Sequence, residues 1–160
     1  MSRPSSPLAP PAVVVDANVL ISVCSNEPTL TTAAGALAAY ALAGSTFYAP
    51  GIVVAEVLYV LCVKVQSNVL SPTQYDNAIV IFEDQMKAIS LVPHGDASLI
   101  GRAKEIQAGY GCSRSADGLY IALAEALTKL GPAELVTFDR GIVNQSAKHA
   151  TGVKVNLLPI

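Results

Sequence analysis

Four acidic residues of this 160-residue chain stand inside apolar segments or directly at their ends. Asp16 follows the run AVVV, Glu56 interrupts GIVVAEVLYVLCV, Asp117 precedes GLYIALAEAL, and Asp139 follows LVTF. A carboxylate that loses its water without gaining a partner has a raised pKa or destabilises the fold. We therefore expect these acids to have a partner, a metal ion or a chemical task.

The chemistry that suits such a set of acids is catalysis with a divalent cation. If the acids share one pocket, their mutual repulsion raises their pKa values unless a cation compensates the charge. Carboxylate oxygens without His or Cys match Mg²⁺ or Mn²⁺, which keep coordinated waters and accept phosphate oxygens. One or two such ions can activate water and stabilise the leaving oxygen when a phosphodiester is cleaved.

The segments that must position these acids alternate between short β-rich runs and longer helical stretches. Each β-rich run is mostly apolar and is bounded by Gly, Pro or polar residues, which is typical of parallel strands covered on both faces. The pattern predicts a three-layer α/β/α fold with a five-stranded parallel sheet flanked by helices. The predicted strands are 12–15, 46–49, 90–92, 134–138 and 153–157.

The predicted helices carry recognisable end signals. Pro28 suits the first position of a helix that stops near Gly44. Ser71, Pro72 and Gln74 form the pattern of a capping box, opening a helix that runs to about residue 87. A helix over 51–66 precedes it, so two consecutive helices should form a hairpin.

Strand ends decide where the acids meet. In an open parallel sheet the functional crevice lies beyond the carboxyl ends of the strands. Asp16 follows the first strand and Asp139 the fourth, so both emerge at one rim if these strands are neighbours. Glu56 lies early in a helix and Asp117 in the first turn of another, and both can lean over that rim.

Composition limits the class of protein. Only 14% of the residues are charged and 52% are hydrophobic, so we expect a partner to cover some apolar surface. The apolar stretch 52–63 is interrupted by Glu56 and is shorter than the roughly 20 residues that span a bilayer. The Pro- and Ser-rich residues 1–11 resemble a flexible tail rather than a signal peptide, ahead of a single domain over 12–160. We therefore expect a cytoplasmic protein with no membrane contact.

Charge and cysteine content exclude two further classes of protein. A net charge of −2 does not provide the basic field of a dedicated nucleic-acid binder, so a local patch or bound cations would have to hold a polyanion. Cys24, Cys62 and Cys112 are odd in number and widely spaced, which argues against a disulfide framework or a zinc site. They are expected to be reduced packing residues.

Four blocks of sequence resemble a known family. They are VVVDANVLISV (13–23), VVAEVLYVL (53–61), SADGLYIALAEAL (115–127) and LVTFDRGI (135–142). In this order they are similar to the PIN-domain nucleases, particularly the VapC-type toxins of bacterial toxin–antitoxin pairs. The resemblance implies an endoribonuclease dependent on Mg²⁺ or Mn²⁺, usually a homodimer, with an antitoxin protein as partner.

The resemblance also implies roles for individual residues. The catalytic and metal-binding acids would be Asp16, Glu56 and Asp117, with Asp139 as the fourth, supported through hydrogen bonds by Asn18 and Thr137. Two positions depart from the family: Gly118 stands where Ala is usual, and Ile142 replaces a common aromatic. Arg114, Arg140 and Lys148 lie close in sequence to the third and fourth acids and are candidates to contact RNA phosphates.

Each acid also has a purely structural interpretation. Asp16 could cap a helix, Asp117 could favour a helix dipole, and Asp139 could be a turn residue. Glu56, flanked by hydrophobic residues, would need a basic partner.

Two other functions stay open as alternatives. A phosphohydrolase could use Asp16 as a nucleophile, although Asn18 stands where such enzymes place a second Asp. A non-catalytic PIN-like protein could bind RNA or a protein and regulate it without cutting RNA.

Overall fold

The computed structural model describes residues 8–112 and 116–160. The described residues form a five-stranded sheet in the order β3-β2-β1-β4-β5, with every pair parallel. The predicted strands are confirmed, and their ends move by at most one residue. The strands are β1 (Ala12–Val15), β2 (Phe47–Ala49), β3 (Ile89–Leu91), β4 (Ala133–Thr137) and β5 (Lys154–Leu157).

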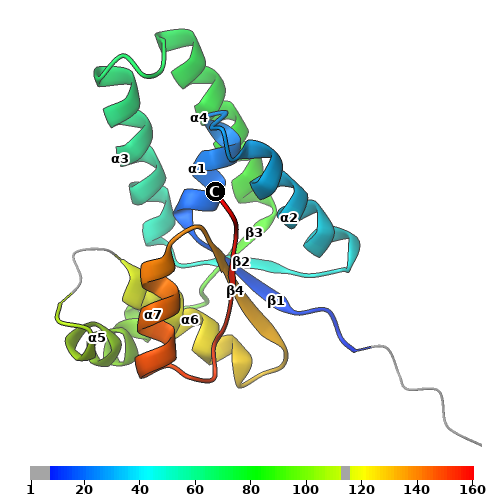
Figure 1. Ribbon diagram of the computed structural model, residues 1–160, viewed down its shortest axis with the longest axis vertical. Helices are drawn as coiled ribbons and strands as arrows, with labels where there is room; N and C mark the ends of the chain where they lie inside the picture. The colour runs from blue at the N-terminus through cyan, green and yellow to red at the C-terminus, as the bar shows by residue number, and fades with distance from the viewer. Residues whose placement is uncertain (1–7, 113–115) are drawn as a thin grey trace, which may run out of the picture.

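Helices cover both faces of this sheet. Figure 1 shows α1 to α4 on one side and α5 to α7 on the other, which confirms the three-layer architecture. The predicted hairpin of α3 and α4 projects away from the sheet (Figure 1). The helices are α1 (Ala17–Cys24), α2 (Leu30–Leu42), α3 (Ile52–Gln66), α4 (Pro72–Lys87), the short 3₁₀ helix η1 (Asp96–Leu99), α5 (Ile100–Gly109), α6 (Asp117–Thr128) and α7 (Arg140–His149).

The helix ends follow the sequence signals with one correction. Ser71 and Gln74 make both bonds of the predicted capping box at the start of α4. The prediction that α2 begins at Pro28 was wrong, because Leu30 N–H donates to the Glu27 carbonyl and closes a turn over 27–30 first. The helix ends as predicted beside Gly44, whose φ of +85° suits glycine.

The centre of the core explains the first apolar run. β1 lies between β2 and β4, and Val13, Val14 and Val15 are at most 1% exposed. A strand buried on both faces has no polar alternation, so it is read in the sequence as a continuous apolar run. Val15 pairs with Val136 of β4, which places the ends of β1 and β4 side by side.

Three other predictions concern the chain as a whole. The described residues include no helix that is both long enough and apolar enough to cross a membrane. All three cysteines are free thiols, with Cys24 buried and Cys62 and Cys112 exposed. Residues 1–7 of the expected tail lie outside the described part of the chain.

Candidate active site

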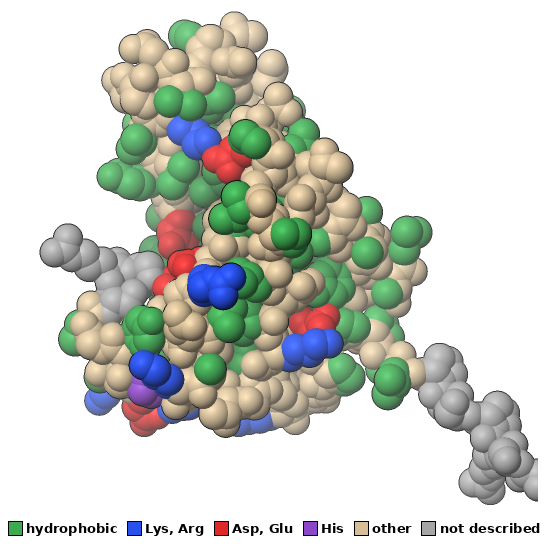
Figure 2. Space-filling model, in the orientation of Figure 1, with side chains coloured by type: hydrophobic (Ala, Val, Ile, Leu, Met, Phe, Trp, Pro, Cys, Tyr) green, Lys and Arg blue, Asp and Glu red, His purple; other side chains and the backbone are tan. Residues whose placement is uncertain are grey.

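Asp16, Glu56 and Asp117 come together at the carboxyl end of the sheet. Asp16 follows β1 and is 7% exposed, Glu56 lies in the second turn of α3, and Asp117 is the first residue of α6. The pKa of Asp16 is raised from 3.8 to about 7, chiefly by burial and also by the charges of Asp117 and Glu56, against the lowering effect of the hydrogen bond from Thr137. Figure 2 shows acidic side chains close together on one face of the molecule.

A hydrogen-bond network from β4 holds Asp16. The Thr137 hydroxyl donates to Asp16 Oδ2 over 2.6 Å and accepts from Asn18 Nδ2 over 3.2 Å. The side-chain oxygen of Asn18, Oδ1, accepts in turn from the Phe138 backbone N–H at 3.3 Å. Asp16 occupies the N-cap position of α1, yet its side chain makes no capping hydrogen bond. The Thr137 hydroxyl is therefore the side-chain hydrogen-bond donor that holds this carboxylate.

Glu56 has a hydroxyl partner in place of the basic partner that a structural interpretation requires. The Tyr120 hydroxyl, on α6, donates to Glu56 Oε2 over 2.5 Å, and Tyr120 is 1% exposed. Burial, and then the charges of Glu56 and Asp16, raise the pKa of Tyr120, so the phenol remains a proton donor. Burial also raises the pKa of Glu56, against the hydrogen bond from Tyr120, and the charge of Asp117 adds to that rise.

Asp117 is held from α7. Gln145 is 2% exposed, and its Nε2 donates to Asp117 Oδ2 over 2.8 Å. The glycine that follows Asp117 has a packing reason: a Cβ on Gly118 would lie 3.1 Å from the Ala103 carbonyl oxygen of α5. The departure from Ala at this position therefore lets α5 and α6 approach closely.

Asp139 lies at the rim of the three-acid cluster. Its side chain is exposed and caps α7 by accepting from Gly141 N–H at 2.6 Å, as the turn interpretation expects. Its backbone N–H also donates to the Thr137 hydroxyl over 2.9 Å, which links it to the network of Asp16. Ile142, in the same helix, is completely buried in the core.

The three candidate RNA contacts have different positions. Arg140 is exposed in the first turn of α7, one residue after Asp139. Lys148 lies at the opposite end of α7, with Nζ 5.7 Å from the centroid of the Tyr110 ring. Arg114 lies outside the described residues.

Sequence reasoning missed three residues that hold this site: Tyr120, Gln145 and Asp96. Asp96, at the start of η1, accepts hydrogen bonds from the N–H groups of Gly51 (2.6 Å) and Ile52 (2.9 Å). It caps α3 from 44 positions away and so fixes the first turn of the helix that carries Glu56. One sequence signal existed for Tyr120: it is three residues after Asp117 and therefore on the same helix face.

The donor set suits a hard divalent cation held by few protein ligands. Among the described residues, no group of three His, Cys, Asp or Glu side chains has the geometry of a ready-made metal cluster. Mg²⁺ is usually held by one or two carboxylates and completes its shell with water and substrate phosphates. The pKa of Asp16 is raised by burial and, to a smaller extent, by the charges of Asp117 and Glu56, and a cation bound beside Asp16 would favour its ionised form. Asp16 and Asp117 could thus hold such an ion.

Known proteins are similar to this chain in sequence profile and in fold. Residues 13–148 match the sequence profile of the PIN domain. The fold is similar to a chain in the crystal structure of VapBC2 from Rickettsia felis bound to a DNA fragment from their promoter. That likeness has a TM-score of 0.62 at 16% identity and covers 92% of this chain and 99% of the other. No curated protein sequence matches.

Proposed function

The chain belongs to the PIN domain family, and we propose that it is a Mg²⁺- or Mn²⁺-dependent endoribonuclease that hydrolyses RNA phosphodiester bonds. The observation that supports this most directly is the convergence of Asp16, Glu56 and Asp117, with the pKa of Asp16 raised to about 7. A buried carboxylate such as that of Asp16 costs stability, so its presence at the functional edge of the sheet favours a catalytic role.

In this proposal Asp16 and Asp117 bind the cation, and Glu56 completes the acidic cluster around it. The bound cation supplies charge stabilisation on the phosphate oxygens and lowers the pKa of the attacking water. Thr137 and Gln145 orient the carboxylates of Asp16 and Asp117 through their hydrogen bonds. The Tyr120 hydroxyl, on α6, holds the Glu56 carboxylate of α3 through its hydrogen bond.

Asp139 would act at the rim of the cluster as the fourth acid. Its carboxylate is exposed and lies beside Arg140 at the start of α7. Arg140 could there bind an RNA phosphate that approaches the acids. We propose no such role for Lys148, which packs over Tyr110 at the other end of the helix.

We also propose a homodimer and an antitoxin protein as partners. The homodimer is supported by apolar side chains on the outer surface of α3, where Val54, Leu58, Tyr59 and Val63 are exposed, Tyr59 by 70%. The antitoxin is supported by the four sequence blocks similar to VapC-type toxins and by the likeness to the VapBC2 structure. A toxin of this kind would act on cytoplasmic RNA.

The test of the nuclease is cleavage of a mixed pool of single-stranded and structured RNAs by the purified protein. Cleavage should require Mn²⁺ or Mg²⁺, stop in EDTA, and be lost in Asp16→Asn. Asp84→Asn is the matched control, because Asp84 is exposed and makes only a surface ion pair with Lys87. Equal cleavage by wild type and Asp16→Asn would refute the assigned site, and no cleavage with either metal would refute the nuclease.

A further inference from the structure

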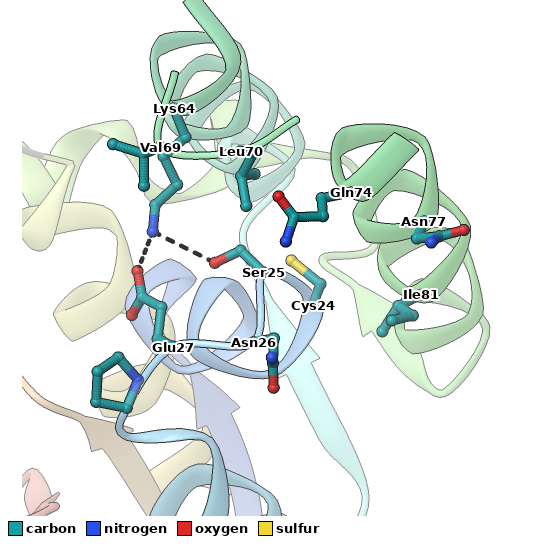
Figure 3. Close-up of a pocket in the computed structure, with 11 residues that line it drawn as sticks. Cys24, Ser25, Asn26, Glu27, Lys64, Val69, Leu70, Gln74, Asn77 and Ile81 are labelled. Carbon is teal, nitrogen blue, oxygen red and sulfur yellow. Dashed lines mark hydrogen bonds and ion pairs between the residues drawn. The ribbon is translucent and has the colours of Figure 1, made fainter. Parts of the chain in front are cut away.

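A second polar site lies at the end of α1 that is remote from Asp16. A pocket of about 390 Å³ opens between the end of α1, the end of α3 and the start of α4. This volume falls within the roughly 300–1,000 Å³ of small-molecule sites. Figure 3 shows its lining, which includes Ser25, Glu27, Lys64, Leu70, Asn77 and Ile81.

One wall of the pocket is a partly buried ion pair. Lys64 Nζ contacts Glu27 Oε1, and the two side chains are only 19% and 30% exposed. Lys64 Nζ also donates to Ser25 Oγ over 3.4 Å (Figure 3). Taking two charges out of water is costly, and such pairs in a cavity are candidates for ligand recognition. The pair presents a donor directly beside an acceptor.

The other walls are suited to binding rather than to covalent chemistry. Leu70 and Ile81 provide apolar surface, and Asn77 provides an amide. Burial raises the pKa of the Cys24 thiol to about 11, so this thiol lines the pocket in its neutral form. A flat, partly apolar ligand with a polar edge matches this combination.

The pocket is linked to the acidic cluster through two adjacent helices. At one end of α1 and α3, Asp16 and Glu56 act on each other electrostatically. At the other end, Lys64 contacts Ser25, just after α1. Eight residues separate Glu56 from Lys64, or about 12 Å along a helix. Single-stranded RNA with a phosphodiester at the acids could place a nearby base in the pocket.

We propose that this pocket binds an unpaired guanine base of the RNA, close to the bond that is cut; this rests on the proposed nuclease function. Unpaired bases are recognised through hydrogen bonds to their Watson–Crick edges. The edge of guanine carries an acceptor, O6, beside two donors, N1–H and the 2-amino group. O6 would accept from Lys64, and both donors would bind the Glu27 carboxylate. Uracil and adenine lack two adjacent donors there.

Mononucleotide binding to full-length Asp16→Asn protein in EDTA tests the pocket apart from cleavage. GMP should bind about tenfold more tightly than AMP or UMP, and IMP, which lacks the 2-amino group, should be weaker than GMP. Lys64→Met and Glu27→Gln, each added to this protein, should remove the preference for GMP. Glu83→Gln, at an exposed position on α4, is the matched control and should keep it.

A charge-exchange variant distinguishes loss of the guanine site from loss of folding. The double variant Glu27→Lys with Lys64→Glu retains an ion pair but reverses donor and acceptor, so it should fold and still lose the preference for GMP. Equal binding of GMP, AMP and UMP, or a GMP preference that survives the exchange, would overturn the guanine site. If the protein does not cleave RNA but its preference for GMP still depends on Glu27, the proposed nuclease function is refuted and the guanine site is supported. If the Glu27→Gln variant cleaves RNA at the same positions as wild type, the guanine site is refuted and the nuclease function is supported.

Discussion

The hydroxyl of Thr137 donates a 2.6 Å hydrogen bond to Oδ2 of Asp16, although 121 positions separate the two residues. This bond lowers the pKa of Asp16, whereas burial and the neighbouring acids raise it to a net value of about 7. The pairing of β1 with β4 thus places Asp16 beside its hydrogen-bond donor and also at a buried position where its negative charge is costly.

Asp16→Asn should make the metal-free protein more stable at neutral pH. In the native wild type Asp16 has a pKa of about 7, against 3.8 ordinarily, so its stability contribution falls as pH rises from about 4 to about 7. Asn carries no charge at any pH. The variant's advantage should be small near pH 4 and reach up to about 4 kcal/mol above pH 7. Urea unfolding in EDTA across this range measures it, and a difference that does not change with pH would contradict it.

The same variant should lose its response to metal. On the proposed function Mn²⁺ or Mg²⁺ would bind only the folded site, so it should raise the Tm of wild type and of the exposed-site control Asp84→Asn. Asp16→Asn should show little rise at the same concentration. Thermal unfolding with and without metal distinguishes the two cases, and an equal rise in all three proteins would place the metal elsewhere.

Thr137→Val should cost about 1–3 kcal/mol, because the Asp16 carboxylate loses its donor and Asn18 loses its acceptor. Thr137→Ser removes a methyl group but keeps the hydroxyl, so it should preserve the response to metal. Carboxyl NMR should show the pKa of Asp16 rising above about 7 in Thr137→Val but not in Thr137→Ser. If Thr137→Ser lost as much stability and metal response as Thr137→Val, the packing of the Thr137 methyl group would be responsible rather than the hydrogen bond.

Tyr120→Phe should destabilise the protein by about 1–3 kcal/mol, since the half-buried Glu56 carboxylate then loses its donor. Its metal-induced rise in Tm should shrink, but less than in Asp16→Asn, because Asp16 and Asp117 keep their partners. Tyr59→Phe is the matched control at a position that is 70% exposed, and it should be neutral. Chemical unfolding and thermal shifts measure both effects; unchanged behaviour of Tyr120→Phe would remove its positioning role.

Asp96→Ala should cost about 1–2 kcal/mol, because two N–H groups at the start of α3 lose their acceptor. Asp84→Ala, which removes only an exposed ion pair, should change stability by less than about 1 kcal/mol. If Asp96→Ala lost no more stability than this control, water would be accepting the two N–H hydrogen bonds as well as the carboxylate does. Urea unfolding of both variants provides the comparison.

A helix or strand could be predicted from sequence where a local pattern of residues determines it. A fully buried strand requires an apolar run, and a capping box requires Ser71 and Gln74 three residues apart, so β1 and α4 could be read directly. The start of α2 could not be read, because a turn at Glu27 competes with the helix signal of Pro28. Sequence likewise offered no reason for Gly118, which depends on the approach of α5.

Sequence by itself identified the four acidic residues and the apolar segments that contain or adjoin them. Only the tertiary structure decided that Asp16, Glu56 and Asp117 meet while Asp139 stays at the rim, and that Tyr120, Gln145 and Asp96 hold the site. The reason is that residue types and periodicity determine burial locally. Hydrogen bonds and charge repulsion depend instead on distances between side chains, which the strand order and helix packing set across 28 to 121 positions of the chain.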